Sequence, residues 1–320
     1  MGIFDSFKKT LSGEKDPPKE QAPVREETVP AGPKIAAMAR DEKADFKLLI
    51  SLFQGHKVGQ DIDFAAFVRK VNPEATPHKC PHCGVVHEFK ASRARKCPAC
   101  SEKMVVRQGL FITEDQAKEI EKDTQDFYEK QGVVSRAGFS LEAAQDYKVR
   151  KQRAEYLHAL AEAFRYMAQV GNQKDSNGYS FWDKAWGYYN EARIEEMKEL
   201  RQDMMQYSRL PDIFWDMTQM LLDQAKSETK EDRAVKGKRQ ALTQACMTLA
   251  EAAKLGADPY FITDVYALAK KQINELSVTD DDFKNIATDV ATRMRLDGSA
   301  LKKYEGWMRE LIEYQVIDRF

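Results

Sequence analysis

Four cysteines stand in two Cys-x-x-Cys pairs, a spacing typical of the ligands of a structural metal ion. Cys80 and Cys83 form the first pair within CPHCG, and Cys97 and Cys100 form the second within CPAC. Each pair predicts a zinc knuckle, a tight turn in which both thiolates converge on one ion. Four thiolates form a closed tetrahedral shell and leave no position for a catalytic water. The spacing therefore predicts a structural Zn²⁺ ion, with iron as the less favoured alternative because a four-cysteine shell also holds Fe.

The metal site belongs to a predicted zinc ribbon of residues 78–112. Strand-like runs at Val85–Phe89 and Met104–Ile112 follow the first and the second knuckle. Three histidines of this segment could each replace a cysteine as a ligand: His78, His82 and His87. Because four cysteines are already present, we expect these histidines to face solvent.

The segment Cys80–Ile120 resembles the zinc ribbons of many uncharacterised bacterial and phage proteins. The shared features are a CPxCG knuckle, a basic hairpin, a second CPxC, a Val-Arg strand and an acidic helix. The resemblance covers about an eighth of the chain, and it implies a structural ion with no known activity. Ser101 stands where glycine usually follows the second knuckle, which we expect to strain that turn without removing a ligand.

The same segment is similar, more weakly, to the rubredoxin-like part of rubrerythrins. The residues that carry this similarity are Cys80, Cys83, Gly84, Val86, His87, Glu88 and Cys97-Pro98-Ala99-Cys100. The similarity implies iron at the cysteines and a di-iron site built from two Glu-x-x-His pairs on bundle helices. This chain offers one such pair, Glu155 with His158. We therefore do not expect a di-iron peroxidase, and we interpret His158 as an ordinary helix residue.

The predicted ribbon carries a strongly basic island, accompanied only by Glu88 and Glu102. Besides Lys79, its cations are Lys90, Arg93, Arg95, Lys96, Lys103 and Arg107, which we take as the candidate binding residues. Such a cluster could neutralise phosphates of a nucleic acid, with Phe89 or Phe111 as a stacking face. An acidic protein partner explains the charge equally well, and a solvated face is the simplest alternative.

Residues 1–11 are predicted to form an amphipathic helix. The apolar residues of its one face are Ile3, Phe4, Phe7 and Leu11. Residues 12–34 are rich in Pro, Glu and Lys and poor in apolar residues, which predicts a disordered linker. This arrangement suits weak docking on a partner or a membrane surface, and a frayed terminus without a role is the alternative.

Helical periodicity dominates the rest of the chain. Residues 35–77 predict a short helical section, and residues 113–320 predict an all-helical domain of roughly six or seven helices. In that domain Thr113 opens a capping box for a helix that runs to Gly132, and Ser140 can cap the next helix. Further helix starts are predicted at Phe181, Pro211, Asp258-Pro259, Thr279 and Ser299. The expected fold is mainly α, with a small β zinc ribbon inserted between a short N-terminal helical section and a C-terminal multi-helix body.

A weak internal echo raises the possibility of helical-hairpin repeats in that body. Phe181-Trp182-Asp183 and Phe214-Trp215-Asp216 stand about 33 residues apart. The alternative is that both triplets are helix starts that bury aromatic residues in a common core. Trp182, Trp186 and Tyr189 could line a groove for a partner helix, although core packing is the default at helical spacing.

Composition narrows the class of protein. The 320 residues, 42% of them hydrophobic, can bury sizeable cores, and the net charge of -1 gives no global attraction to nucleic acid or membranes. No apolar run reaches the roughly 18 residues of a membrane-spanning helix. Cysteines in metal-binding pairs suit a reducing compartment, so we expect a cytoplasmic protein.

The sequence contains no recognised catalytic motif: no P-loop, dinucleotide fingerprint, nucleophile elbow or His-Glu-x-x-His. Cys246 is predicted to be a buried helix residue. A solvated acidic face is predicted from Glu191, Glu195, Glu196 and Glu199. We therefore expect a non-enzymatic scaffold or adaptor that binds macromolecular partners, with proteins favoured. A nucleic-acid-binding accessory protein is the first alternative and a rubredoxin-type iron redox protein the second, and no small-molecule substrate is identified.

Overall fold

The computed structural model describes residues 41–56, 63–171, 173–202, 208–256 and 261–313. Contacts divide the chain into one unit of residues 1–39 and another of residues 40–320, and all described residues belong to the second. The predicted helix of residues 1–11, the predicted linker of residues 12–34 and the helix start at Asp258-Pro259 lie outside the described residues. The finer division of the chain into domains stays a prediction.

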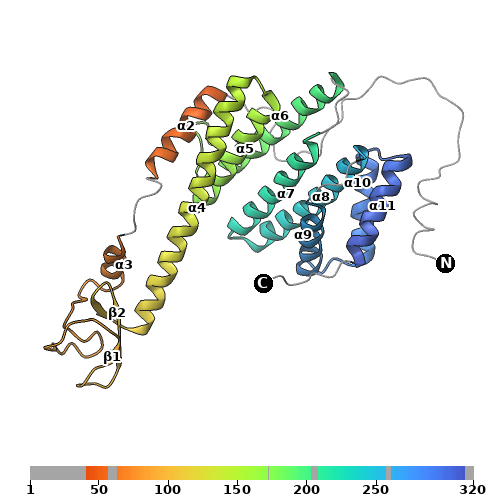
Figure 1. Ribbon diagram of the computed structural model, residues 1–320. Coiled ribbons are helices and arrows are strands. Elements are labelled where there is room, and N and C mark those ends of the chain that lie inside the picture. Colours follow the sequence, from red (N-terminus) through yellow and green to blue (C-terminus); the bar gives the residue numbers. More distant parts are fainter. Residues whose placement is uncertain (1–40, 57–62, 172, 203–207, 257–260, 314–320) are drawn as a thin grey trace, which may run out of the picture. The chain divides into compact units, whose positions relative to one another are not determined.

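Helices dominate the described part of the chain, which confirms the mainly α fold class (Figure 1). Two helices, α2 (Glu42–Gly55) and α3 (Phe64–Val71), precede a small sheet of β1 (Arg95–Lys96), β2 (Lys103–Arg107) and β3 (Leu110–Ile112). The helices that follow are α4 (Glu114–Arg150), α5 (Arg153–Val170), α6 (Phe181–Gln202), α7 (Leu210–Ser227), α8 (Glu231–Lys254), α9 (Ile262–Glu275), α10 (Asp280–Arg293) and α11 (Gly298–Glu313). None of the helices described is both long and apolar enough to span a membrane.

The sheet is antiparallel, with β2 between β1 and β3. Gln108 and Gly109 join β2 to β3, and both have positive φ (49° and 71°), the backbone of a type I′ hairpin turn. The predicted strand Met104–Ile112 is therefore a hairpin of two strands. The predicted strand Val85–Phe89 is wrong, because only a single bridge at Val86 remains of it.

The ribbon has a small core of its own, and a second cluster connects it to the helices. The ribbon core consists of Cys80, Ala91, Cys97, Met104 and Phe111. The second cluster joins α3, β3 and the start of α4 through Val68, Ile112, Ala117 and Ile120. The predicted capping box is confirmed, because the Thr113 hydroxyl accepts from the Gln116 N–H (3.1 Å) while the Gln116 side chain accepts from the Thr113 N–H (3.0 Å). Helix α4 thus starts at the ribbon with its first N–H groups satisfied.

Helix α4 is longer than predicted. It runs unbroken from Glu114 to Arg150, so it neither ends near Gly132 nor restarts at Ser140. A glycine inside a helix costs only about 1 kcal/mol relative to alanine, which is too little to end a long helix. Ser140 is a buried residue of the helix interior. The helix ends instead at Lys151, which adopts a left-handed φ of 61°.

The two Phe-Trp-Asp triplets lie on consecutive helices, the first opening α6 and the second within α7. A repeated helical hairpin would place equivalent residues two helices apart, so this echo does not mark such a repeat. Phe181, Trp182 and Phe214 are buried, as is Tyr189. Trp186 packs half-buried against the same core. These aromatic residues thus pack in the interior, but they share no common core, because Phe181 and Trp182 belong to one core cluster and Trp215 packs against another. The second triplet also lies inside α7 and does not start that helix.

A fully buried lysine connects α2 to α6. The side chain of Lys184 is 1% exposed, and its amine lies 3.0 Å from Asp45 of α2 and 2.8 Å from Asp175. Tyr188 donates to Asp45 at 2.7 Å. Burial disfavours the charged amine, but Asp175 and Asp45 outweigh it and hold the pKa of Lys184 above its usual value. The core between these elements therefore contains a paired ion network in which every member needs the others.

Replacing Lys184 by methionine should lower the free energy of unfolding by about 3–5 kcal/mol, because Asp45 and Asp175 would lose their counter-charge inside the core. Urea unfolding followed by circular dichroism measures the change. The matched control is Lys198→Met, which removes an exposed ammonium that pairs with Glu195 on the same helix and should cost under about 1 kcal/mol. Equally small effects of the two substitutions would show that the buried network is not needed.

Candidate metal centre and basic surface

The two Cys-x-x-Cys turns have the same backbone geometry. In the first, the Gly84 N–H donates to the Cys80 carbonyl at 3.0 Å, and in the second the Ser101 N–H donates to the Cys97 carbonyl at 2.8 Å. In both, the N–H of the first cysteine donates to the carbonyl just beyond the turn, at 2.9 and 2.8 Å. The segment therefore contains two copies of one knuckle, as the spacing of its cysteines predicts.

The four sulfur atoms converge on one point. Cys80 and Cys100 have their Sγ atoms 3.8 Å apart, as do Cys83 and Cys97, and all four lie within 4.8 Å of one another. All four are free thiols. Sulfur ligands at about 2.3 Å from a tetrahedral ion lie about 3.8 Å from one another. The spacing therefore fits a closed shell of four ligands around one metal ion.

Gly84 and Ser101 occupy equivalent positions after the two knuckles. Their φ angles of 74° and 64° are both left-handed, a conformation that costs a residue with a Cβ but not glycine. The strain expected at Ser101 is therefore present. It does not displace a ligand, because the Sγ atoms of Cys83 and Cys97 keep the same 3.8 Å separation as the other pair.

The three ribbon histidines differ in their surroundings. His82 is exposed, as predicted, whereas His78 and His87 are half-buried. The Nε2 atom of His87 lies 3.3 Å from the Cys97 sulfur, and its ring stacks on Phe89 with centroids 4.6 Å apart. His87 therefore contacts a ligand without replacing it, and the expectation that all three histidines face solvent is wrong for two of them.

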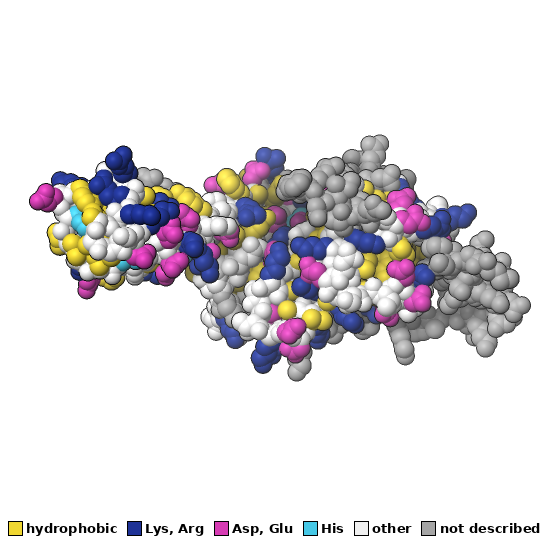
Figure 2. All heavy atoms as spheres, turned by 90° about the horizontal axis from the view of Figure 1, so that it is seen from below, with side chains coloured by type: hydrophobic (Ala, Val, Ile, Leu, Met, Phe, Trp, Pro, Cys, Tyr) yellow, Lys and Arg dark blue, Asp and Glu magenta, His cyan; other side chains and the backbone are white. Residues whose placement is uncertain are grey.

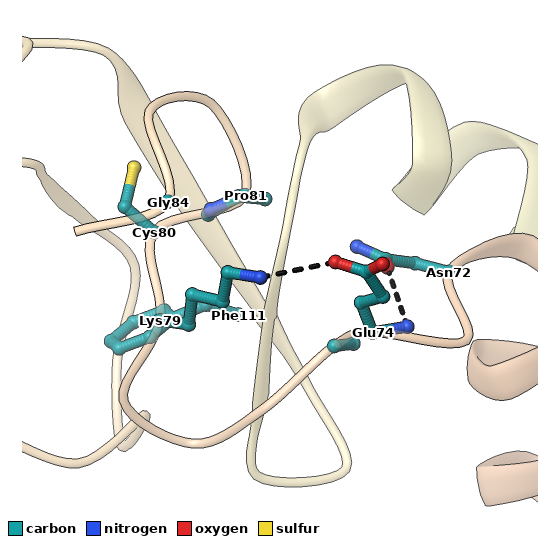
Figure 3. Close-up of a pocket in the computed structure, with 8 residues that line it drawn as sticks. Asn72, Glu74, Lys79, Cys80, Pro81, Gly84 and Phe111 are labelled. Carbon is teal, nitrogen blue, oxygen red and sulfur yellow. Dashed lines mark hydrogen bonds and ion pairs between the residues drawn. The ribbon is translucent and has the colours of Figure 1, made fainter. Parts of the chain in front are cut away.

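A hollow of about 220 Å³ lies beside the first knuckle (Figure 3). Lys79 reaches across it to Glu74 at 3.0 Å. The Cys80 sulfur points away from that ion pair in Figure 3, and Cys80 is 1% exposed. Of the four cysteines, Cys80 alone is among the residues that line this hollow.

The thiols of the second knuckle differ in acidity. Burial opposes ionisation of Cys97, but the backbone N–H groups of Cys100 and Ala99 outweigh it and lower the pKa of the Cys97 thiol to about 6. For Cys100 the backbone N–H of Glu102 favours the thiolate, but burial and the neighbouring sulfurs outweigh it and raise the pKa to about 12. Like charges at such short distances cannot all persist without a cation. Binding of a metal ion must therefore displace protons.

Five of the six candidate basic residues fall into two groups. Lys103 pairs with Glu114, and Arg107 pairs with Glu121, so both cations help to fasten β2 to α4. Three others are exposed and form no ion pair with any residue that the structure describes: Lys90, Arg93 and Lys96. Figure 2 shows Lys and Arg side chains gathered on the ribbon, at the left of the view, next to hydrophobic side chains. Two cations of the basic island thus form ion pairs with α4, and three are exposed without an ion pair among the described residues.

The sixth cation, Arg95, covers an aromatic ring. Its guanidinium carbon lies 4.2 Å from the centre of the Phe89 ring, and His87 stacks on the same ring at an interplanar angle of 8°. A parallel ring and a guanidinium cannot share one face, so they cover opposite faces of Phe89. Phe111 is fully buried. The prediction that Phe89 or Phe111 offers a stacking face to a nucleobase is therefore wrong.

A buried charge cluster in the helical body was not predicted. His158 of α5 lies 2.7 Å from Asp216 of α7 through Nε2 and 3.1 Å from Arg209 through Nδ1. Arg165 pairs with Asp223 at 2.8 Å. Helix α5 is buried on most of its sides, so a polar residue there needs a partner. His158 is therefore not an ordinary helix residue.

His158, Glu162 and Asp216 lie close enough together to hold a cation, but the protonation of His158 argues against one. Arginine can only donate, so the ring nitrogen that faces Arg209 must be the unprotonated one. The other nitrogen then carries the proton and donates to Asp216. A metal ion needs an unprotonated ring nitrogen, and neither is free. The hydrogen bonds of His158 instead connect α5 to α7 and to the residue that precedes it.

Two smaller expectations have different outcomes. Glu196 is buried and accepts a hydrogen bond from the Arg209 N–H at 2.7 Å, so the prediction of a solvated acidic face is wrong for this residue. Cys246 is buried as predicted, and burial raises the pKa of its thiol to about 12. A thiol of that acidity is unreactive at neutral pH.

Comparison of the chain with family models, with curated proteins and with solved structures gives no match. The resemblances to bacterial and phage zinc ribbons and to rubrerythrins therefore stay predictions.

Metal binding should release protons and should weaken as the pH falls. At about pH 7.5 the Cys97 thiol is ionised and the Cys100 thiol is protonated, so the ion displaces at least the Cys100 proton. Because the pKa of Cys97 is lowered, its thiolate is lost only as the pH falls through about 6. Calorimetric titration with Zn²⁺ in buffers of different ionisation enthalpy counts the protons. Zero protons released, with equal affinity on both sides of that pH, would contradict a thiolate shell.

Cys97→Ser should abolish stoichiometric metal binding, because it removes one of four ligands. Residues 78–112 should then lose their fixed structure, while the helix content should change little because the helices have separate cores. The matched control is Cys246→Ser, since Cys246 lies in a helical core and should not affect metal content. Elemental analysis and circular dichroism measure both effects. Full metal content in Cys97→Ser would rule out this centre.

Proposed function

We propose that this protein is a non-enzymatic adaptor in which a structural zinc ion holds the ribbon in shape and the basic surface of the ribbon binds an acidic protein partner. The observation that carries the proposal is the division of the ribbon's cations. Lys103 and Arg107 are paired with α4, whereas Lys90, Arg93 and Lys96 are exposed without an acidic partner among the described residues. Unpaired exposed cations on a rigid module are available to a charged partner.

Zinc is the metal that this proposal assigns to the four cysteines. It favours four tetrahedral ligands in structural sites, and two knuckles with sulfurs 3.8 Å apart suit that preference. A shell of four protein ligands has no open position for substrate or water, so the ion has a structural role and no catalytic one. Iron in a rubredoxin-type site remains the alternative. Reduced thiolates fit the expected cytoplasmic location.

A protein partner suits this surface better than a nucleic acid does. Neither aromatic ring of the ribbon offers a free face, and stacking is a main source of affinity for single strands. Val85 and Val86 are 42% and 72% exposed, and the ribbon therefore also offers apolar contact area of the kind that protein interfaces bury. The predicted apolar face of Ile3, Phe4, Phe7 and Leu11 would be a separate docking element for a protein or a membrane.

Reversing the three free cations together, as Lys90→Glu, Arg93→Glu and Lys96→Glu, should weaken retention of the native partner by about tenfold or more. The immobilised full-length chain is exposed to native extract, and retained proteins are quantified by mass spectrometry. The matched control reverses three exposed lysines outside the ribbon, Lys43, Lys47 and Lys130, and should retain the partner. Equal retention by both triple variants would sink the proposal.

The same variants separate the alternatives. Filter binding to single- and double-stranded nucleic acid at low salt should show no affinity that depends on these three cations. Tight binding that the ribbon reversal abolishes, without any protein partner, would favour the nucleic-acid-binding accessory protein. A red protein that contains iron would favour the rubredoxin-type alternative.

A further inference from the structure

We infer that the acidic partner binds as an extended strand along the free edge of β1, with one of its carboxylates held by Arg95. This inference rests on the proposed function and specifies the conformation of the partner and the residue that recognises it. Three observations carry it: an open strand edge, a basic charge along that edge and a guanidinium already fixed in place.

Within the part of the chain that the structure describes, β1 pairs with β2 alone, so its other edge is open. Arg95 lies opposite Met104, and the Cys97 N–H donates to the carbonyl of Glu102. In an antiparallel pair such bonds involve every second residue. By this alternation the N–H and C=O groups of Ala94 and Lys96 point away from β2, to the side of β1 on which no other described strand pairs.

The opposite edge of the sheet is covered. There the Phe111 N–H of β3 donates to the carbonyl of Thr76 at 3.2 Å. A strand added to this sheet would therefore have to lie beside β1. Such addition uses main-chain hydrogen bonds for affinity and side chains for specificity.

The positive charge near β1 determines which kind of strand could pair with it. Lys96 is an exposed residue of β1, and Lys90 and Arg93 are exposed residues shortly before it in the chain. Cations on an edge oppose pairing with a second copy of the same edge, since like charges on opposing strands are destabilising. The same cations attract a strand that carries Asp or Glu. Pairing of this edge with a second copy of itself is therefore disfavoured, whereas pairing with an acidic peptide is favoured.

Arg95 supplies a fixed binding point for a carboxylate. Its guanidinium packs over Phe89 at 4.2 Å, while its Nε is buried and has no hydrogen-bond partner within the described residues. A guanidinium held by stacking loses little freedom when it binds, and its planar fork matches a carboxylate with two parallel hydrogen bonds. Lysine could supply the charge but neither the stacking nor the fork.

The test uses the full-length zinc-loaded chain and two synthetic peptides that differ only in the backbone. The first is a short peptide of alternating Glu and Val, and the second is the same peptide with every second amide N-methylated. Fluorescence anisotropy should show binding of the first peptide and at least about tenfold weaker binding of the second, because methylation removes main-chain hydrogen bonds but no charge. Hydrogen exchange should slow at residues 93–96 only with the first peptide.

Two conservative variants test the role of Arg95. Arg95→Lys should weaken binding of the Glu-Val peptide by about tenfold, while Arg93→Lys, the matched control, should change it by less than about twofold. Metal content should be unchanged in both, which shows that the ribbon is intact.

The outcomes separate this inference from the proposed function. Equal affinity for both peptides, or no affinity for either, would overturn strand addition. Neither result would affect the proposal that Lys90, Arg93 and Lys96 retain a native partner. Equal loss in the two arginine variants would overturn the special role of Arg95. Retention of the native partner after reversal of all three lysine and arginine charges would overturn the proposed function itself.

Discussion

Four cysteine sulfurs lie within 4.8 Å of one another, and as thiolates they would repel each other so strongly that they could share this place only around a cation. The ribbon depends on this constraint. Its apolar core is small, and β1, β2 and β3 are short, so burial alone supplies little stability to a module of this size. The backbone N–H groups that surround Cys97 are already arranged to favour its thiolate. An ion held by the four cysteines would therefore fix the shape of the surface that the ribbon displays.

The start of α4 attaches the ribbon to the helical body. Thr113 and Gln116 cap the helix directly after β3, and Glu114 and Glu121 pair with Lys103 and Arg107 of β2. Acidic residues in the first turns of a helix also favour its dipole. These pairs use one part of the ribbon's positive charge for attachment and leave another part exposed. The same segment is therefore both a structural joint and a charged surface.

The sequence was most informative where a pattern is local. The metal ligands, the capping box at Thr113 and the helix start at Thr279 depend on residues a few positions apart, and the structure agrees with each. It was least informative where partners are distant in the chain. Lys184 meets Asp45, and His158 meets Asp216, only after the helices pack. The predicted helix end near Gly132 was wrong because the free-energy cost of one glycine is small in a helix of 37 residues.

The distinction between a structural and a reactive metal centre decides how the rest of the ribbon is understood. If the ion is closed off, the surface carries the function, and the edge of β1 with Arg95 and Phe89 becomes the place to examine. X-ray absorption at the zinc edge of the purified full-length protein tests this most directly. The account predicts one zinc ion per chain with four sulfur neighbours at about 2.3 Å. A shell that contains a nitrogen or oxygen ligand, or iron in place of zinc, would contradict it.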